Sequence, residues 1–340
     1  MSQRGPVRFS VLDLVPIIEG GTAAEALRRS LELARCAERW GYHRFWVAEH
    51  HNMPGVASAA TAVVVGHLAA GTSTLRVGSG GIMLPNHAPL VIAEQFGTLE
   101  SLYPGRIDLG LGRAPGSDQA AMLAIRGPQG RSGDTFPRDV QELQGYFAAP
   151  RDGARRVRAV PGEGLAVPLY LLGSSTFSAQ LAAALGLPFA FAAHFAPGAM
   201  YDAIRLYRDG FEPSASWDRP YVMVALNIVV AASDGEARRL FTSLQQQFLN
   251  LLRGHPRQLP PPVDSMDSLW TPAEAAHVRH MTQHAVVGAP ETVVGRLSSL
   301  IASTGADEII ATAHIHDQAA RLRSFELLAD VARGLSHQPA

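Results

Sequence analysis

Lysine is absent from this sequence, so arginine supplies all 29 of its basic side chains. They are balanced by 30 acidic side chains, which leaves a formal net charge of −1. Nucleic acids and acidic membranes are attracted by surfaces with a strong excess of positive charge, and this composition does not provide one. We therefore expect neither a nucleic acid nor a membrane among the partners of this protein.

Cysteine is nearly absent as well. It occurs once, at Cys36, which excludes a disulfide bond within the chain. The chain has no run of about 18 consecutive apolar residues, the length that a membrane-spanning helix requires. Its first residues also lack the basic region and apolar stretch of a signal peptide. These absences predict a cytoplasmic protein, and 47% hydrophobic residues are ample for a large core.

Short apolar segments alternate with helical patterns along most of the chain. Strands are expected at residues 7–14, 43–48, 75–83, 106–111, 167–172, 189–193, 221–231 and 308–313. Helices are expected after them, at 22–40, 58–70, 89–102, 136–147, 177–185, 198–210, 234–252 and 319–333. Eight such units predict one α/β domain over residues 1–340, a (β/α)8 TIM barrel, with a doubly wound open sheet as the alternative.

Two stretches interrupt this alternation, residues 114–135 and about 253–285. Long loops inserted in a compact barrel usually carry function or move, and we expect both at the carboxyl-terminal rim. Four prolines between 256 and 262 prevent a regular helix at the start of the second stretch. Its later part, 271–283, has a helical pattern with little apolar surface to anchor it. We expect this segment to be mobile and to cover the barrel mouth.

Polar and glycine residues gather where expected strands end. Glu49, His50 and His51 follow the second strand, at the rim where barrel catalysis takes place. The alternative interpretation of these three residues is a polar turn without a catalytic role. Gly80 and Gly81 interrupt the third strand, and glycine within a strand marks a bulge or a close backbone approach. Without side chains at these two positions, a flat ring could lie against the backbone of the strand. The alternative interpretation of the two glycines is a kink in the strand.

A candidate anion site follows the fourth and fifth strands. Arg113 stands after the fourth strand, and a Gly/Ser run, residues 173–178, leads from the fifth strand into a helix. Unpaired N–H groups and the positive end of a helix dipole favour an anion, and a guanidinium binds phosphate well. Because the two strands are neighbours, the pattern predicts one phosphate site, with ordinary helix capping as the alternative. The glycines at 110–116 match neither a dinucleotide-binding fingerprint nor a P-loop.

Taken together, these motifs resemble those of the bacterial-luciferase-like flavin-dependent monooxygenases. The resemblance extends over nearly the whole chain. It is closest to a subgroup of the family that includes tailoring enzymes of aromatic polyketide pathways. Each motif is short, but their order and spacing are specific. The matching segments are residues 47–51, 77–85, 104–113, 173–178 and 288–291.

The resemblance implies roles for particular residues. His50 matches the catalytic histidine of the family, and Glu49 matches a carboxylate at the same rim. Gly80 and Gly81 match a cis peptide bond beside the isoalloxazine ring. The positions matching those that bind the flavin phosphate are Arg113, Ser174, Ser175 and Ser178.

It also implies a reaction and partners. Reduced FMN and dioxygen would oxygenate a small organic substrate, such as an aromatic polyketide, and a separate flavin reductase would supply the reduced flavin. A homodimer is implied through the helices at 61–70 and 89–102, and no metal is expected.

Three other functions remain open from the sequence. A deazaflavin (F420)-dependent oxidoreductase of the same superfamily would share the fold and the rim. A metal-dependent TIM-barrel hydrolase is suggested by His314 and His316 on the last strand, but no metal-spaced carboxylates stand near them in the pattern. A flavin-storage subunit without catalysis is the third, and the presence of His50 and Arg113 argues against it.

Overall fold

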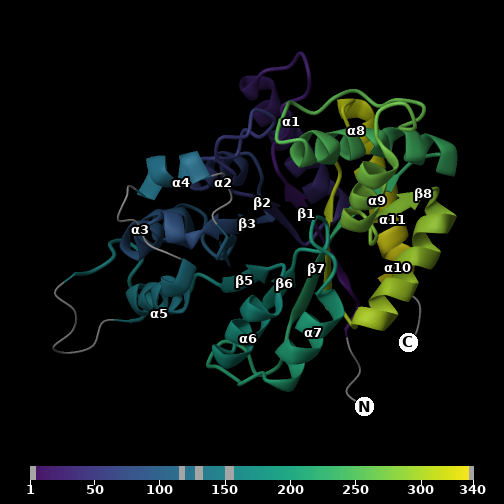
Figure 1. Ribbon diagram of the computed structural model, residues 1–340. Helices are drawn as coiled ribbons and strands as arrows, with labels where there is room; N and C mark the ends of the chain where they lie inside the picture. Colours follow the sequence, from purple (N-terminus) through teal and green to yellow (C-terminus); the bar gives the residue numbers. More distant parts are fainter. Residues whose placement is uncertain (1–4, 115–118, 127–132, 150–156, 337–340) are drawn as a thin grey trace.

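Parallel strands form a closed barrel in the computed structural model, which describes residues 5–114, 119–126, 133–149 and 157–336 (Figure 1). The order around the sheet is β6-β5-β4-β3-β2-β1-β9-β7, and β6 pairs with β7 to close the circle. The predicted TIM barrel is therefore confirmed. Its strands are β1 (Arg8–Asp13), β2 (Arg44–Val47), β3 (Arg76–Met83), β4 (Ile107–Gly112), β5 (Leu169–Gly173), β6 (Phe189–Phe191), β7 (Val222–Val230) and β9 (Glu308–Thr312).

Helices surround the barrel, and their ends follow local sequence signals. α1 begins with a capping box formed by Thr22 and Glu25 and ends at Gly41, whose φ of 85° is left-handed. None of the described helices is both long and apolar enough to cross a membrane. The helices are α1 (Ala23–Trp40), α2 (Thr61–Ala70), α3 (Pro89–Leu102), α4 (Gln119–Arg126), α5 (Phe136–Phe147), α6 (Thr176–Ala184), α7 (Met200–Asp209), α8 (Asp234–Leu252), α9 (Pro272–Met281), α10 (Pro290–Thr304) and α11 (Gln318–Ser336), with short 3₁₀ turns η1 (Leu84–Asn86) and η2 (Gly133–Thr135).

Some elements were not expected from the sequence. The ninth strand, β8 (Val286–Gly288), pairs with the end of β7, beyond the part of β7 that pairs with β9. Three residues give too short a pattern to separate a strand from a loop. Helix α10 was missed next to it, and α4 lies within the stretch 114–135 that was interpreted as a loop. Residues 115–118 and 127–132 of that stretch lie outside the described residues.

The segment 253–285 is better anchored than its sequence suggested. Leu259 is fully buried, its N–H donates to the carbonyl of Ile17, and its own carbonyl accepts from the N–H of Glu19, at 2.9 and 2.8 Å. Val278 of α9 is also fully buried and packs in a small cluster with Met266. The expectation of little anchoring apolar surface was therefore wrong. That the segment moves and covers the mouth stays a prediction.

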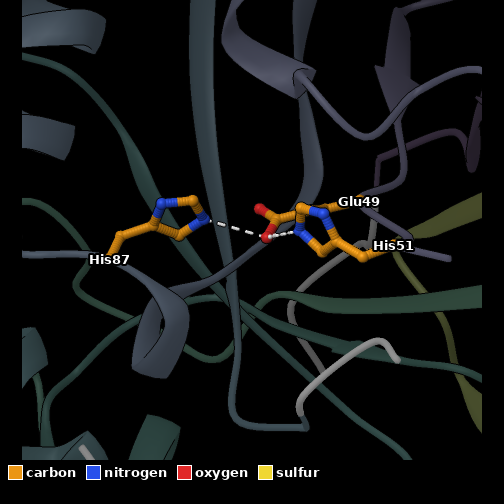
Figure 2. A group of neighbouring side chains, drawn as sticks. All are labelled: Glu49, His51 and His87. Carbon is orange, nitrogen blue, oxygen red and sulfur yellow. Dashed lines mark hydrogen bonds and ion pairs between the residues drawn. The ribbon is translucent and has the colours of Figure 1, made fainter. Parts of the chain in front are cut away.

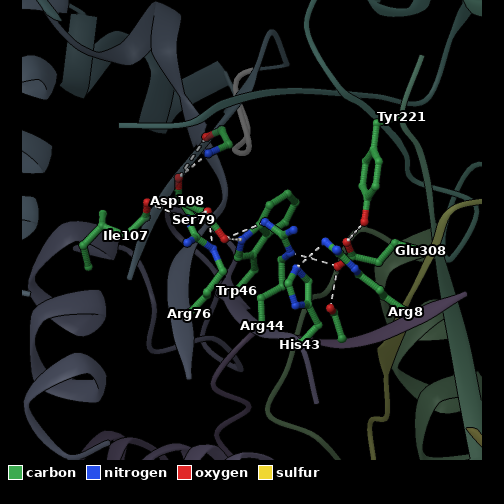
Figure 3. A network of polar contacts seen from close by, with 12 residues as sticks. Arg8, His43, Arg44, Trp46, Arg76, Ser79, Ile107, Asp108, Tyr221 and Glu308 are labelled. Carbon is green, nitrogen blue, oxygen red and sulfur yellow. Dashed lines mark hydrogen bonds and ion pairs between the residues drawn. The ribbon is translucent and has the colours of Figure 1, made fainter. Parts of the chain in front are cut away.

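A buried charge network occupies the amino-terminal ends of the strands (Figure 3). Arg44, the first residue of β2, donates to Asp108 at 2.7 Å and to Glu308 at 2.9 Å. Arg76 makes a second ion pair with Asp108, and the Tyr221 hydroxyl donates to Glu308 at 2.7 Å. Burial lowers the pKa of Arg44, but the two carboxylates outweigh that effect and raise it well above its usual value. The base of the barrel therefore carries its charges in compensated pairs.

Candidate active site at the carboxyl-terminal rim

The predicted site residues come together at one end of the barrel because all its strands are parallel. They lie at or near the carboxyl ends of β2, β3, β4 and β5, which are successive neighbours in the sheet. Barrel enzymes place their chemistry at this end. The residues are Glu49 and His50 after β2, Gly80 and Gly81 in β3, Arg113 after β4, and Ser174, Ser175 and Ser178 around the start of α6.

Glu49 is almost fully buried, with 1% of its side chain exposed. One carboxylate oxygen, Oε1, accepts hydrogen bonds from Nε2 of His51 at 2.8 Å and from Nε2 of His87 at 2.9 Å (Figure 2). The other oxygen accepts the backbone N–H of Met83 at 3.1 Å. A carboxylate from β2 thus binds two histidines, one of which follows β3, and fixes both rings.

These contacts keep Glu49 ionised. Burial raises the pKa of the carboxyl, but the bonds from His87 and His51, with that from the Met83 N–H, outweigh burial and hold the pKa below its usual value. Glu49 was predicted from its place after β2. His87 was not, although it follows the expected third strand, because only the fold shows that its ring faces Glu49.

The bond between Gly80 and Gly81 is cis, as predicted. Both residues are required to be glycine by the packing of neighbouring strands. A Cβ at Gly80 would lie 2.8 Å from Leu12 Cδ1, and one at Gly81 would lie 2.7 Å from the carbonyl oxygen of Gly110. The strand register shifts between Ser79 and Ile82, around this pair. Close approach of β3 to its neighbours therefore explains both glycines without a ligand.

The residues predicted to form an anion site come from two elements, the end of β4 and the start of α6. The guanidinium of Arg113 lies 4.1 Å from the ring centroid of Phe177, in the first turn of α6. Ser175 is the N-cap of α6, and its side chain makes no capping hydrogen bond. Ser178 is 3% exposed and packs on Gly173, where a Cβ would come within 2.4 Å of the serine Cβ. A cation thus stands beside the positive end of a helix dipole, which suits a phosphate.

Two further histidines at the rim belong to this region. His194 follows β6 and His314 follows β9. Burial lowers the pKa of His194 to about 3 and that of His314 to about 4, and the nearness of His50 lowers both further. Nδ1 of His314 lies 2.8 Å from Oε1 of Gln247, in α8. These rings are therefore neutral at pH 7 and lie near His50.

Sequence reasoning missed His194 and gave His314 another role. A lone histidine after an apolar strand is more often a core residue than part of a site, so nothing distinguished His194 in the pattern. His314 was considered as a metal ligand together with His316. In the structure its hydrogen-bond partner is the amide of Gln247.

Comparison with known proteins agrees with the motifs. Residues 7–308 match the family model described as luciferase-like monooxygenase. A luciferase-like monooxygenase of Escherichia coli (strain K12) is 57% identical over 329 residues, covering 97% of this chain and 98% of that protein. An N-acetyl-S-alkylcysteine monooxygenase of Bacillus subtilis (strain 168) is 42% identical over 189 residues, 55% of this chain and 57% of that protein.

Solved structures share the same architecture. The crystal structure of apo-MsnO8 has a TM-score of 0.85 and 36% identity, covering 98% of this chain and 100% of that chain. Two more distant structures show likeness of fold alone. They are the oxygenating constituent of 3,6-diketocamphane monooxygenase in complex with FMN, at TM-score 0.71, and an F420-dependent secondary alcohol dehydrogenase, at 0.67. The family model and the long alignments lead to one conclusion: this chain belongs to the luciferase-like monooxygenase family.

Proposed function

We propose that this protein is a flavin-dependent monooxygenase that uses reduced FMN and dioxygen to oxygenate a small organic substrate. The observation that carries the proposal is the position of Arg113 on Phe177, at the start of α6 and at the same rim as His50. FMN has a phosphate, and this arrangement combines a guanidinium with the N-terminus of a helix. Bound reduced FMN supplies the electrons that activate dioxygen.

The side chains of the rim would divide the remaining work. Arg113 and the serines at the start of α6 hold the phosphate and so orient the ring system along the rim. His50 holds or accepts a proton near the reacting atoms. The neutral histidines His194 and His314 accept hydrogen bonds without bringing charge into the site. The segment 253–285 excludes water when it lies over the mouth.

The substrate class follows from similarity and is the least specific part of the proposal. An aromatic polyketide is suggested by the sequence motifs, and an N-acetyl-S-alkylcysteine by the name of the Bacillus subtilis relative. We propose these two classes as the first to test. Incorporation of label from ¹⁸O₂ into a product, with reduced FMN supplied by a separate reductase, is the expected result.

Cofactor preference provides a direct binding test. Titration with FMN, riboflavin and F420, followed by flavin fluorescence, is expected to give the tightest binding for FMN. Tightest binding of F420 would instead assign the chain to the deazaflavin-dependent oxidoreductases. FMN binding with no oxygenated product from either substrate class, in the presence of reductase, would favour the flavin-storage alternative.

We also propose a homodimer through α2 and α3. Apolar side chains on these helices are exposed: Val63 by 73%, Leu102 by 62% and Val91 by 42%. A second copy of the chain would cover them. Light scattering at micromolar concentration is expected to show a dimer, and Val63→Glu is expected to shift it toward monomer. A monomeric unmodified protein would contradict the proposal.

A further inference from the structure

Glu49, His51 and His87 form a compact group of potential metal ligands (Figure 2). Each offers one ligand atom, and these atoms all lie within 4.8 Å of one another. Two come from the segment after β2 and the third follows β3, so two neighbouring strands fix their spacing. The group is a carboxylate with two imidazoles, a donor set that suits divalent transition metals rather than magnesium or calcium.

The two distances from the Glu49 oxygen fit coordination to one ion, and the ligand atoms of the two histidines lie within 4.8 Å of each other. Glu49 Oε1 lies 2.8 and 2.9 Å from the two Nε2 atoms. Ligand atoms about 2.1 Å from a metal and at right angles to one another are about 3.0 Å apart. The hydrogen bonds that now link the three side chains therefore hold them close to the positions that a metal would require.

Charge favours a cation at the same place. Glu49 is an almost fully buried anion, and no arginine forms an ion pair with it among the described residues. Two imidazoles now stabilise this carboxylate, and a bound divalent cation would place a full positive charge at the same oxygen. Access is open, because 20% of the His51 side chain and 27% of the His87 side chain are exposed.

We propose that Glu49, His51 and His87 bind one divalent transition metal ion, such as Zn²⁺, Fe²⁺ or Co²⁺, at the carboxyl-terminal rim. The backbone N–H of Met83 holds the second carboxylate oxygen, so Glu49 contributes a single oxygen. Three protein ligands leave coordination positions open toward the rim, where water or an oxygen of a small molecule binds. The site does not depend on flavin and goes beyond the proposed monooxygenase function.

The test uses the full-length protein without an affinity tag, treated with EDTA and then titrated with Co²⁺. We expect one equivalent to bind, with visible absorption bands of Co²⁺ bound by nitrogen and oxygen ligands. Glu49→Gln and His87→Ala are expected to weaken binding by more than about 100-fold, beyond the 10–100-fold typical for loss of a residue that only supports a ligand. Circular dichroism and thermal unfolding establish that each variant is folded.

Histidines elsewhere on the surface provide the matched control. His277 and His280 lie three positions apart on α9 and could bind metal adventitiously. The double variant His277→Ala/His280→Ala is expected to keep the full equivalent of Co²⁺. Loss of binding in that variant, or retention in Glu49→Gln, would overturn the proposal. Absence of stoichiometric binding would also overturn it.

Failure here is distinguishable from failure of the proposed function, because FMN affinity is measured separately on the same metal-free protein. FMN binding without metal binding rejects only the metal site. Metal binding without FMN binding rejects only the flavin proposal and favours the metal-dependent class of barrel enzyme.

Discussion

The two ends of the barrel treat buried charge in different ways. At the base, Arg44 lies between Asp108 and Glu308, so that each charge meets an opposite charge (Figure 3). At the rim, one buried ion pair joins Arg321 to Asp13. Glu49, however, meets two histidines there, and the Arg113 guanidinium lies on an aromatic ring. The buried charges at the base are paired with one another, and we expect these pairs to stabilise the barrel. At the rim, Glu49 and Arg113 are the charges that we propose to contact a ligand.

Backbone conformation shows the same contrast. Val15, just after β1 at the rim, has a φ of 51° although it is β-branched and fully buried. Such a conformation is rarely adopted by valine and persists only where its surroundings impose it. Asn52, after β2, also has a positive φ, of 55°, which asparagine tolerates more readily. Local strain of this kind gathers at functional sites, here on the side of the barrel with the candidate site.

The largest expected effect is a loss of stability when the cation of the base is removed. Arg44→Met would leave two fully buried carboxylates without their shared cation. We expect the free energy of unfolding to fall by about 3–5 kcal/mol, measured by urea denaturation. The matched control is Arg205→Met, since the exposed Arg205–Asp202 pair contributes about 0–1 kcal/mol. Equal losses in both variants would contradict the distinction between a compensated base and a solvated surface.

A smaller effect on binding is expected at the rim. Arg113→Ala is expected to weaken FMN binding by about 1.5–3 kcal/mol, the range for a charged hydrogen bond, with little change in stability. Riboflavin lacks the phosphate, so its affinity should be nearly the same in both proteins. An equal loss of affinity for both flavins would show that Arg113 does not contact the phosphate.

The remaining effect, which is nearly absent at pH 7, is a dependence of stability on pH that both ends share. Burial lowers the pKa of His43 at the base to about 4, as it does for His314 at the rim. An unfolded histidine binds its proton near pH 6.5, so the unfolded state gains protons first as the pH falls. The contribution of each histidine to stability should be constant well above pH 6.5 and decrease between pH 6.5 and about 4, by up to about 1.4 kcal/mol per pH unit.

Single substitutions separate the two contributions. His43→Gln and His314→Gln should each flatten the pH dependence of the unfolding free energy, measured in urea between pH 7.5 and 4.5. A slope unchanged in both variants would mean that other groups govern the acid response.

Much of the barrel was predictable because its signals are local. The apolar periodicity gave α3, α5 and α8 with the bounds that the structure has. Parallel strands bring their carboxyl ends to one edge, so the pattern also predicted that Glu49, His50 and Arg113 share the rim. What could not be predicted depends on side chains that meet only in the fold. The contacts of His87 with Glu49, and of Arg44 with Glu308, join residues 38 and 264 positions apart.

The pairing of β8 with the end of β7 bears on how this barrel can vary. The N–H of Ala289 donates to the side chain of Asp234 at 2.7 Å, although the two are 55 positions apart. The chain therefore leaves β7, forms α8 and α9, and returns through β8 to the point of departure (Figure 1). Because its two ends meet, this excursion can lengthen, shorten or be exchanged between relatives at small entropic cost while the strands keep their places.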